Sequence, residues 1–448
     1  VRALVCGTRG RWFESTLLYQ KMTKEKNNKP SKELPVGFVD RQEKELLVRD
    51  FIISNIKEVM IKYGFQYLET PSFEYSDSIG KFLPDKERPD EGVFSFRDEN
   101  KWLSLRYDLT APLARYVAKN FLEIPKPFKR YQLGTVWRNE KPGPGRFREF
   151  LQFDADFVGT KSLQADAELC VMISEILENC GLTKSEYIIK ISSRKITEEL
   201  FKKININGNQ QKLTALRALD KIDRLGWDGI KELLGAGRKD KSGDFTKGAN
   251  LKSEDIEVIE KTLKKKSPET EDLVEILKIF KDYNFTNFEF DPSIVRGLEY
   301  YTGVIFEVNL KFDVKNKKGQ VIQFGSIGGG GRYDNLVNNF GNFDAPATGI
   351  SIGLDRLVYA LMQKKEFKFK QSKPVVICVF DKNSMKEYIN VQTTLRKAGI
   401  SAEIYPGESK LKKQMEYANK IKSPAVILYG EDEIKLGKPT LRNLRSGK

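Results

Sequence analysis

The sequence predicts an α+β protein with a core built on an antiparallel sheet, a helical insertion in that core and a C-terminal α/β domain. Three patterns support this prediction. Residues 128–159 contain two strand patterns joined by a Pro/Gly turn, residues 194–285 have mostly helical periodicity, and residues 374–448 alternate strands with helices. The implied boundaries are an N-terminal extension over 1–34, a core over 35–365 and the last domain over 374–448.

Composition places the chain among ordinary globular proteins, because 40% of its 448 residues are hydrophobic and 11% are aromatic. This length allows about two to four domains. No apolar run approaches the roughly 20 residues that span a bilayer, and the N-terminus lacks the pattern of a secretory signal. We therefore expect no membrane partner and a cytoplasmic location.

The net charge and the cysteines indicate the kind of partner and the cellular compartment. The formal net charge of +15 suggests a polyanionic partner, although a charge that only keeps the chain in solution competes, because lysine is spread along the whole sequence. The four cysteines form no Cys-x-x-Cys pair. This favours a reducing compartment and argues against a structural zinc site.

The chain contains no histidine at all. This excludes a histidine general base, a Ser-His or Cys-His nucleophile and any histidine-ligated metal. Its chemistry must therefore depend on arginine, carboxylates, tyrosine and backbone amides, with Mg²⁺ as the remaining metal candidate.

The chain begins with Val1, and Met22 is its first methionine. We interpret residues 1–34 either as a disordered segment, since 22–33 is rich in lysine, asparagine and proline, or as a spurious extension. The codons for residues 12–15 can resemble the T-arm of a tRNA gene. In this second interpretation, synthesis starts at Met22.

A long helix is expected over residues 41–62, where apolar side chains recur at helical spacing. Gly64 follows its end, and glycine is a preferred C-terminal cap. Residues 65–70 then have the composition of a strand, which Pro71 stops. Alone, such a helix and strand would be interpreted as part of a core.

One hairpin is the most informative stretch of the chain. Its expected strands, 131–137 and 150–158, are separated by a Lys-Pro-Gly-Pro-Gly turn at 141–145. In the second strand, apolar residues alternate with three polar side chains that are expected to point the same way: Gln152, Asp154 and Asp156.

Arg138 and Arg146 flank the turn of this hairpin. Fixed cations above a sheet that displays carboxylates suit a substrate that is anionic at one end and cationic at the other. ATP together with an amino acid fits this description. The competing interpretation is a surface hairpin whose charges are simply solvated.

Four other stretches carry patterns that form an ordered set with the hairpin. Residues 105–112 read Leu-Arg-Tyr-Asp-Leu-Thr-Ala-Pro, and 295–303 read Val-Arg-Gly-Leu-Glu-Tyr-Tyr-Thr-Gly. Residues 328–334 read Gly-Gly-Gly-Gly-Arg-Tyr-Asp, and 348–357 read Thr-Gly-Ile-Ser-Ile-Gly-Leu-Asp-Arg-Leu. The glycine run lacks a following Gly-Lys-Ser/Thr, so it is not a P-loop.

In this order, the stretches resemble the motifs of class II aminoacyl-tRNA synthetases, most closely those of the histidyl-tRNA synthetases. The hairpin resembles motif 2, 348–357 resembles motif 3, and 295–303 resembles the family's Arg-Gly-Leu-Asp-Tyr-Tyr signature, with Glu299 for Asp. The resemblance covers nearly everything after residue 34. It implies a histidine–tRNA ligase that uses ATP to form histidyl-adenylate and transfers histidine to the 3′ end of tRNA-His.

Carried over by motif position, the resemblance implies that Arg138 clamps the α-phosphate of ATP and that Glu140 meets the adenine edge. Arg146 and Arg356 are implied to hold the γ-phosphate, with Mg²⁺ bridging the outer phosphates. Arg296 lies where the family places a second catalytic cation. The implied catalytic residues are therefore Arg138, Arg296 and Arg356.

The resemblance also implies a histidine pocket, whose residues are Asp108, Thr110, Gln152, Asp156, Tyr300 and Tyr301. The first three are implied to bind the α-amino group, while Asp156 and Tyr301 bracket the two imidazole nitrogens. Without the resemblance, Asp108 is better interpreted as a helix N-terminal residue.

The remaining segments also have counterparts in the family. The helix and strand at 41–71 resemble motif 1, the dimer interface of class II enzymes, and imply a homodimer. The insertion at 194–285, with a mobile loop expected at 236–250, is expected to face either the tRNA acceptor arm or solvent. The domain at 374–448 resembles an anticodon-binding domain. Relatives usually continue into a further helix, which leaves truncation of this domain as one interpretation.

Two alternatives remain at this point. One is a non-catalytic paralogue, either a regulatory subunit of the histidine pathway or a sensor of uncharged tRNA, although such relatives tend to lose the arginines or the last domain. The other is a synthetase for proline or threonine, which the signature at 295–303 disfavours.

Overall fold

The computed structural model describes residues 31–80, 92–240, 243–295, 301–316, 318–364, 373–407 and 409–444. The chain forms two compact units, Val1–Phe367 and Lys368–Lys448. Of the expected N-terminal extension, residues 1–30 lie outside the described residues.

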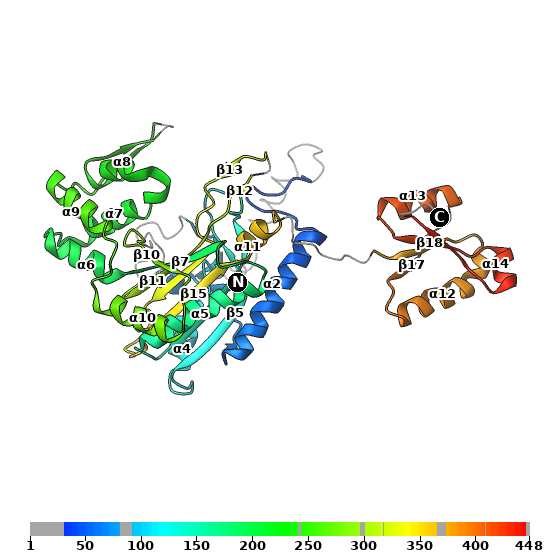
Figure 1. Ribbon diagram of the computed structural model, residues 1–448, viewed down its shortest axis with the longest axis horizontal. Coiled ribbons are helices and arrows are strands. Elements are labelled where there is room, and N and C mark those ends of the chain that lie inside the picture. Colours follow the sequence, from blue (N-terminus) through cyan, green and yellow to red (C-terminus); the bar gives the residue numbers. More distant parts are fainter. Residues whose placement is uncertain are drawn as a thin grey trace, which may run out of the picture. The chain divides into compact units, whose positions relative to one another are not determined.

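An eight-stranded sheet forms the centre of the first unit, with the order β1-β5-β6-β15-β14-β11-β7-β10 (Figure 1). Neighbours from β5 to β7 run antiparallel, whereas the outer pairs β1–β5 and β7–β10 are parallel. The strands are β1 (Gln66–Tyr67), β5 (Phe128–Trp137), β6 (Glu149–Val158), β7 (Tyr187–Ser193), β10 (Phe288–Phe290), β11 (Val304–Leu310), β14 (Gly328–Arg332) and β15 (Ala347–Gly353). The predicted antiparallel core is confirmed.

The first expected strand, over 65–70, is wrong in length. β1 pairs with β5 at two positions, Gln66 with Arg130 and Tyr67 with Tyr131. One further bond joins the amide of Leu68 to the carbonyl of Tyr131 before the chain leaves the sheet. The composition of 65–70 predicted an extended chain but could not show how many of its residues pair with another strand.

The two faces of the sheet differ in chemistry because side chains alternate along each strand. On one face, Phe153 and Ala155 of β6 lie opposite Ile352 and Ile350 of β15, and these residues are buried. On the other face, the polar Asp154 of β6 lies opposite Ser351 of β15. The polar side chains of these two strands therefore lie together on one side of the sheet.

Helices cover the apolar face. Helix α2 (Glu43–Lys62) contacts α5 (Leu163–Asn179) and α11 (Leu354–Leu361), while α10 (Glu271–Asp282) contacts α5 and β7. Helices α5 and α11 lie on β15. The helices expected over 41–62 and 162–183 thus form α2 and α5.

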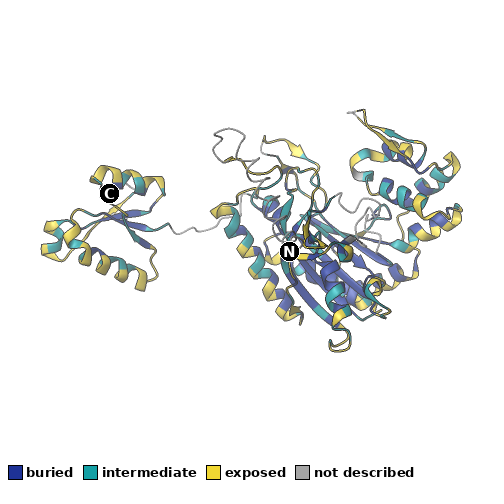
Figure 2. Ribbon diagram, turned by 180° about the vertical axis from the view of Figure 1, so that it is seen from behind, coloured by how far each residue is buried: buried dark blue, intermediate teal, exposed yellow. Residues whose placement is uncertain are grey.

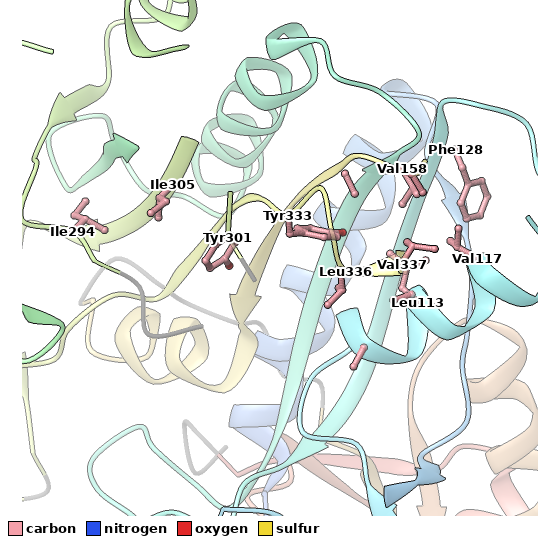
Figure 3. Packing of buried hydrophobic residues seen from close by; sticks show 14 residues of the cluster. Leu113, Val117, Phe128, Val158, Ile294, Tyr301, Ile305, Tyr333, Leu336 and Val337 are labelled. Atoms are coloured by element: carbon pink, nitrogen blue, oxygen red, sulfur yellow. The ribbon is translucent and has the colours of Figure 1, made fainter. Parts of the chain in front are cut away.

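A second apolar cluster closes one end of the sheet (Figure 3). Leu113 and Val117 of α4 (Thr110–Lys119) contribute to it together with Phe128 and Val158 from the ends of β5 and β6. The short η1 helix (Val337–Phe340) packs on α4. Because α4 is anchored in this way, the residues at its N-terminus have fixed positions.

Smaller elements complete the core. A three-stranded sheet has the order β2-β4-β3, and β12 pairs with β13. These elements are β2 (Phe73–Tyr75), α3 (Ser76–Gly80), β3 (Ser95–Asp98), β4 (Lys101–Leu105), β12 (Val314–Lys315) and β13 (Val321–Ile322).

The expected helical insertion has its own apolar cluster, to which α6 (Arg194–Lys203), α7 (Asn209–Leu219), α8 (Ile222–Leu234) and α9 (Ser253–Leu263) contribute. The loop expected to be mobile at 236–250 contains an antiparallel hairpin instead, formed by β8 (Gly237–Lys239) and β9 (Phe245–Lys247). Its polar composition predicted a loop, but backbone pairing gives it structure.

The second unit has a mixed four-stranded sheet with the order β17-β16-β18-β19, in which β19 is antiparallel to β18. Its elements are β16 (Val375–Ile377), η2 (Lys382–Ser384), α12 (Met385–Lys397), β17 (Ala402–Ile404), α13 (Leu411–Lys420), β18 (Ala425–Leu428), α14 (Glu431–Leu436) and β19 (Thr440–Asn443). Val375 and Ile377 join an apolar cluster with α12, whereas Val376 and Cys378 pack with α13 on the other face. The predicted α/β organisation is confirmed, and α14 is an additional helix.

Burial follows this architecture in both units. The strands are mostly buried, whereas the helices of the insertion and of the second unit carry many exposed residues (Figure 2). In the described part of the chain, no helix combines the length and the apolar character that a membrane span requires.

The apolar face of the main sheet should dominate the stability of the first unit. We expect Phe153→Ala, at a fully buried position, to lower the free energy of unfolding by about 3–5 kcal/mol. Phe245→Ala, on the exposed face of β9, is the matched control and should cost less than about 1 kcal/mol. Urea unfolding followed by tryptophan fluorescence measures both, and equal losses would contradict the assignment of the core.

Candidate active site

Residues from distant parts of the chain line one cavity of about 250 Å³ on the polar side of the main sheet. The predicted site residues in its wall are Asp108, Thr110, Arg138, Glu140, Arg146, Gln152, Tyr301 and Arg356. The backbone of the glycine strand β14 contributes Gly328 and Gly329. Arg296 and Tyr300, which were also predicted, lie outside the residues that the structure describes.

A tight turn at 143–146 places Arg146. The amides and carbonyls of Gly143 and Arg146 bond to each other in both directions, at 2.9 Å. Pro144 and Gly145 occupy the central positions, and the φ of +64° at Gly145 is the value that a type II turn requires. A Cβ atom at Gly145 would lie 2.8 Å from the ring of Phe324, so glycine also permits the close approach.

Arg138, which directly follows β5, lies against two aromatic rings. Its guanidinium carbon lies 4.5 Å from the ring centroid of Tyr107 and 5.2 Å from that of Phe150, and its Nε donates to the carbonyl oxygen of Tyr107. Tyr107 in turn donates from its hydroxyl to Glu140. This stacking orients a planar cation, and no ion pair joins it to a carboxylate among the residues that the structure describes.

Arg356 is the most unusual group in the cavity. Its guanidinium carbon lies 4.6 Å from the ring centroid of Phe324, and its buried Nε and Nη2 have no hydrogen-bond partner among the residues that the structure describes. Burial and then the nearby charge of Arg146 lower the pKa of Arg356 to about 10, against the attraction of Glu307. Two mutually repelling cations in one wall create a place for an anion.

The residue before Arg356 fixes the start of α11. Asp355 accepts from the backbone amide of Leu151 at 2.6 Å and from Nε of Arg41 at 2.9 Å. Arg41 also donates to the carbonyl of Glu149. These bonds tie the helix to the edge of β6, so that Arg356 points into the cavity.

The other end of the cavity is acidic and polar. Asp108 accepts from the backbone amides of Thr110 and Ala111, at 3.1 and 2.9 Å, and therefore binds the N-terminus of α4 while lining the cavity. Burial raises the pKa of Asp108, and the bond from Ala111 opposes this effect. The structural and the functional interpretations of Asp108 are thus compatible.

Asp156 is not in the cavity wall. It lies opposite Arg130 on β5, whose Nη2 is 3.0 Å from its Oδ2, and it accepts from the hydroxyl of Tyr333. Burial raises the pKa of Asp156, and Arg130 opposes this shift. Tyr301 and Tyr333 belong to the same apolar cluster (Figure 3).

Sequence reasoning missed several residues of the site. Ser351 lines the cavity, and its position could have been found from its alternation with Ile350 and Ile352. Arg41 and Phe324 carry no local pattern that marks them, because the site residues they contact, Asp355 and Arg356, are remote in sequence. Among the described residues, no group of three or more acidic or cysteine side chains is arranged to hold a metal ion.

Two family models match the chain. The family model described as "Histidyl-tRNA synthetase" matches residues 37–357, and the model described as "Anticodon binding domain" matches residues 374–448. The chain belongs to the histidyl-tRNA synthetase family. The stretch expected to form a class II core and the last domain are therefore both matched by known families.

Relatives of the histidyl-tRNA synthetase family align along most of the chain. A histidine–tRNA ligase from Bartonella quintana (strain Toulouse) is 46% identical over 94% of this chain and 91% of its own length. One from Rhizobium meliloti (strain 1021) is 45% identical over 94% and 90%, respectively.

Solved structures also resemble the chain. The histidyl-tRNA synthetase from Nostoc sp. PCC 7120 is similar with a TM-score of 0.69 and 26% identity, covering 94% of this chain and 96% of that protein. A Bacillus halodurans protein, described as an ATP phosphoribosyltransferase regulatory subunit/histidyl-tRNA synthetase, shares the fold at 22% identity and a TM-score of 0.65. It covers 87% of this chain and 97% of its own.

Nε and Nη2 of Arg356 are buried without a hydrogen-bond partner among the described residues, and this predicts a stability effect of unusual sign. Replacing it by an apolar side chain of similar length, Arg356→Met, removes a buried charge and should raise the free energy of unfolding of the ligand-free protein by about 1 kcal/mol or more. Urea unfolding without nucleotide measures this change.

The matched control is Arg332→Met. Arg332 is paired with buried Asp166 and donates to the carbonyls of Thr160 and Ser162, at 2.9 and 3.0 Å. Its loss should lower the free energy of unfolding by about 3–5 kcal/mol. If both variants destabilise the protein equally, Arg356 has a structural partner and the anion site is wrong.

Proposed function

We infer that this chain activates histidine with ATP to form histidyl-adenylate and transfers histidine to the 3′ end of tRNA-His. The supporting observation is one cavity with two electrically different ends. Arg138, Arg146 and Arg356 line it together with Asp108 and the polar groups beside it. A triphosphate suits the cationic end, and the ammonium group of an amino acid suits the acidic end.

The first step needs positioning and charge stabilisation. A carboxylate oxygen of histidine attacks the α-phosphorus of ATP, the new P–O bond forms, and pyrophosphate leaves with the electrons of the broken bond. We assign Arg138 to the α-phosphate, Arg146 and Arg356 to the γ-phosphate, and Glu140 to the adenine edge. Fixed cations next to the reacting phosphate stabilise the negative charge that develops there.

The second step transfers the acyl group. A hydroxyl of the terminal adenosine of tRNA-His attacks the carbonyl carbon of the adenylate, the ester C–O bond forms, the C–O bond to the phosphate breaks, and AMP leaves with the hydroxyl proton. The proposal includes Arg296 as a second catalytic cation, on its motif position alone. The second unit, matched by the anticodon-binding family, is the candidate for contact with the anticodon.

Selection of histidine is assigned to the other end of the cavity. Asp108, Thr110 and Gln152 are proposed to bind its α-amino group, whereas Tyr301, with Tyr300, and Asp156 contact the imidazole. Oδ2 of Asp156 is already 3.0 Å from Nη2 of Arg130, behind the cavity wall, so the role of Asp156 toward the imidazole rests on its motif position alone. A site that satisfies both ring nitrogens rejects analogues because its own polar groups then remain unpaired.

Mg²⁺ belongs to the proposal as a companion of the nucleotide. The described residues offer no cage of three or more metal-ligating side chains. This suits an ion that arrives on phosphate oxygens and needs at most one or two carboxylates from the protein. When bound, it would neutralise charge on the outer phosphates, while the arginines orient them.

A homodimer through the 41–71 region is part of the proposal. On α2, Phe51 and Ile61 are exposed, and Tyr67 is exposed on the edge strand β1. The neighbouring three-stranded sheet exposes Phe73 and Trp102 as well. Aromatic residues are enriched at interfaces, and this many exposed apolar groups near one edge favour a second copy as the partner.

We propose the cytoplasm as the location, which suits the free cysteines.

The activity is tested by ATP–pyrophosphate exchange with purified protein. Histidine should support exchange, whereas proline and threonine should be at least about 10⁴-fold less effective. Chelation of Mg²⁺ by EDTA should stop the reaction. Exchange with proline or threonine, or none with histidine, would overturn the inference and favour a different synthetase or a regulatory protein.

Arg296→Ala should abolish exchange and leave the thermal unfolding temperature unchanged. Arg238→Ala is the control, because Arg238 lies in the insertion and pairs with Glu232 at 2.9 Å, away from the cavity. It should exchange at the wild-type rate. Near-normal exchange by Arg296→Ala would remove that residue from the catalytic set.

The dimer is tested with the double substitution Ile61→Asp and Tyr67→Asp. Two buried charges in an apolar interface should convert the protein to monomers in sedimentation velocity. Phe245→Asp, on the exposed hairpin of the insertion, should leave the oligomeric state unchanged. A dimer that survives the double substitution would place the interface elsewhere.

A further inference from the structure

Asp154 lies behind the acidic end of the cavity and is not in its wall. It is on β6, between Gln152 and Asp156, and only 1% of its surface is exposed. A carboxylate buried so completely must receive hydrogen bonds, because an unpaired buried charge is strongly destabilising. Its partners therefore show what it does.

Three side chains of the cavity wall donate to Asp154. Nε2 of Gln152 lies 2.6 Å from its Oδ1, and the hydroxyl of Thr110 lies 3.3 Å from its Oδ2. Ser351, directly opposite on β15, also hydrogen-bonds to it through its side chain. Thr110, Gln152 and Ser351 all line the cavity.

These bonds determine what the wall can offer a ligand. An ionised carboxylate only accepts, so each neighbour must turn its donor group toward Asp154. A hydroxyl whose hydrogen is used in this way presents oxygen lone pairs on its other side. Likewise, a side-chain amide whose nitrogen faces Asp154 directs its carbonyl oxygen away from it. The wall beside Asp108 therefore presents acceptors, not donors.

We propose that Asp154 is a positioning residue that sets the hydrogen-bond polarity of this wall, so that Thr110, Gln152 and Ser351 together accept the ammonium group of the amino acid. This rests on the proposed function, which assigns the α-amino group to the same end of the cavity. Asp154 itself touches no substrate. It acts by orienting three side chains from three segments of the chain.

Arg130 provides the balancing charge. It is fully buried on β5, and its Nη2 donates to the carbonyl of Leu109 at 3.0 Å and lies 3.0 Å from Asp156. Burial raises the pKa of Asp154, whereas Arg130, Gln152, Ser351 and Thr110 all lower it. The net pKa of Asp154 is raised, so the polarity argument rests on geometry: side-chain donors face both carboxylate oxygens, Gln152 at Oδ1 and Thr110 at Oδ2.

The competing role is purely structural: Asp154 could simply join β6 to β15 and α4. The two roles differ in what they predict for ligands. A structural defect weakens every ligand of the pocket, but a change of polarity weakens those that carry an ammonium group. Imidazolepropionate, which is histidine without its amino group, separates the two cases, and histidinol keeps the amino group but lacks the carboxylate.

The test is Asp154→Asn, which keeps the size of the side chain but adds a donor. Calorimetric titration should show histidine and histidinol binding about 10- to 100-fold more weakly, because a donor in the wall must then face another donor. The Kd of imidazolepropionate and the KM for ATP should stay within about twofold. Equal weakening of histidine and imidazolepropionate, or no weakening, would overturn the proposal.

Two further variants keep the test decisive if Asp154→Asn folds poorly. Ser351→Ala removes one of the three acceptors and should weaken histidine by about 3- to 10-fold with no effect on imidazolepropionate. Asp291→Asn is the matched control, since Asp291 pairs with Lys190 at 2.7 Å outside the cavity and should leave both affinities unchanged. Loss of imidazolepropionate affinity in Ser351→Ala would again favour the structural role.

Wild-type protein separates this inference from the function on which it rests. If the wild type shows no histidine-dependent exchange, the proposed function fails. If it does, and Asp154→Asn binds histidine normally, only the role of Asp154 fails.

Discussion

The site depends on the register between β6 and β15. Residues about two hundred positions apart, such as Asp154 and Ser351, face each other because the backbone ladder between these strands pairs them directly. The same ladder brings α11, which follows β15, to the edge of β6, where Asp355 accepts from the amide of Leu151. A shift of one residue would turn every polar side chain into the apolar core and every apolar one into the cavity.

Two arginines of the cavity are held in place by aromatic rings and form no ion pair with a carboxylate among the described residues. Arg138 and Arg356 lie against aromatic rings, which hold a guanidinium in place while leaving its charge for a ligand. Arg332 and Arg130, on strands of the main sheet, are instead paired with the buried Asp166 and Asp156 and stabilise the fold. The structure thus distinguishes arginines that are paired with aspartates from those that are available to a phosphate. The residue type alone does not show to which group an arginine belongs.

Much of the site could be predicted from sequence, for reasons that are local. The turn at 143–146 follows from proline and glycine chemistry, and the shared face of Gln152 and Asp154 follows from strand periodicity. Asp156 shows the limit of such reasoning. Periodicity placed it on the correct face, but only the opposite strand reveals that Arg130 holds it behind the cavity wall.

The sequence alone determined the main helices and strands, the polar face of the hairpin and the ordered motifs of the family, because each depends on residues within a few positions of one another. Tertiary structure decided which cations share a cavity, which are neutralised, and that Asp154 faces three donors. These properties depend on distances between segments that lie from tens of residues to about two hundred residues apart. Such distances are set by strand register and by contacts between helices and the sheet. Neither can be predicted from the local sequence.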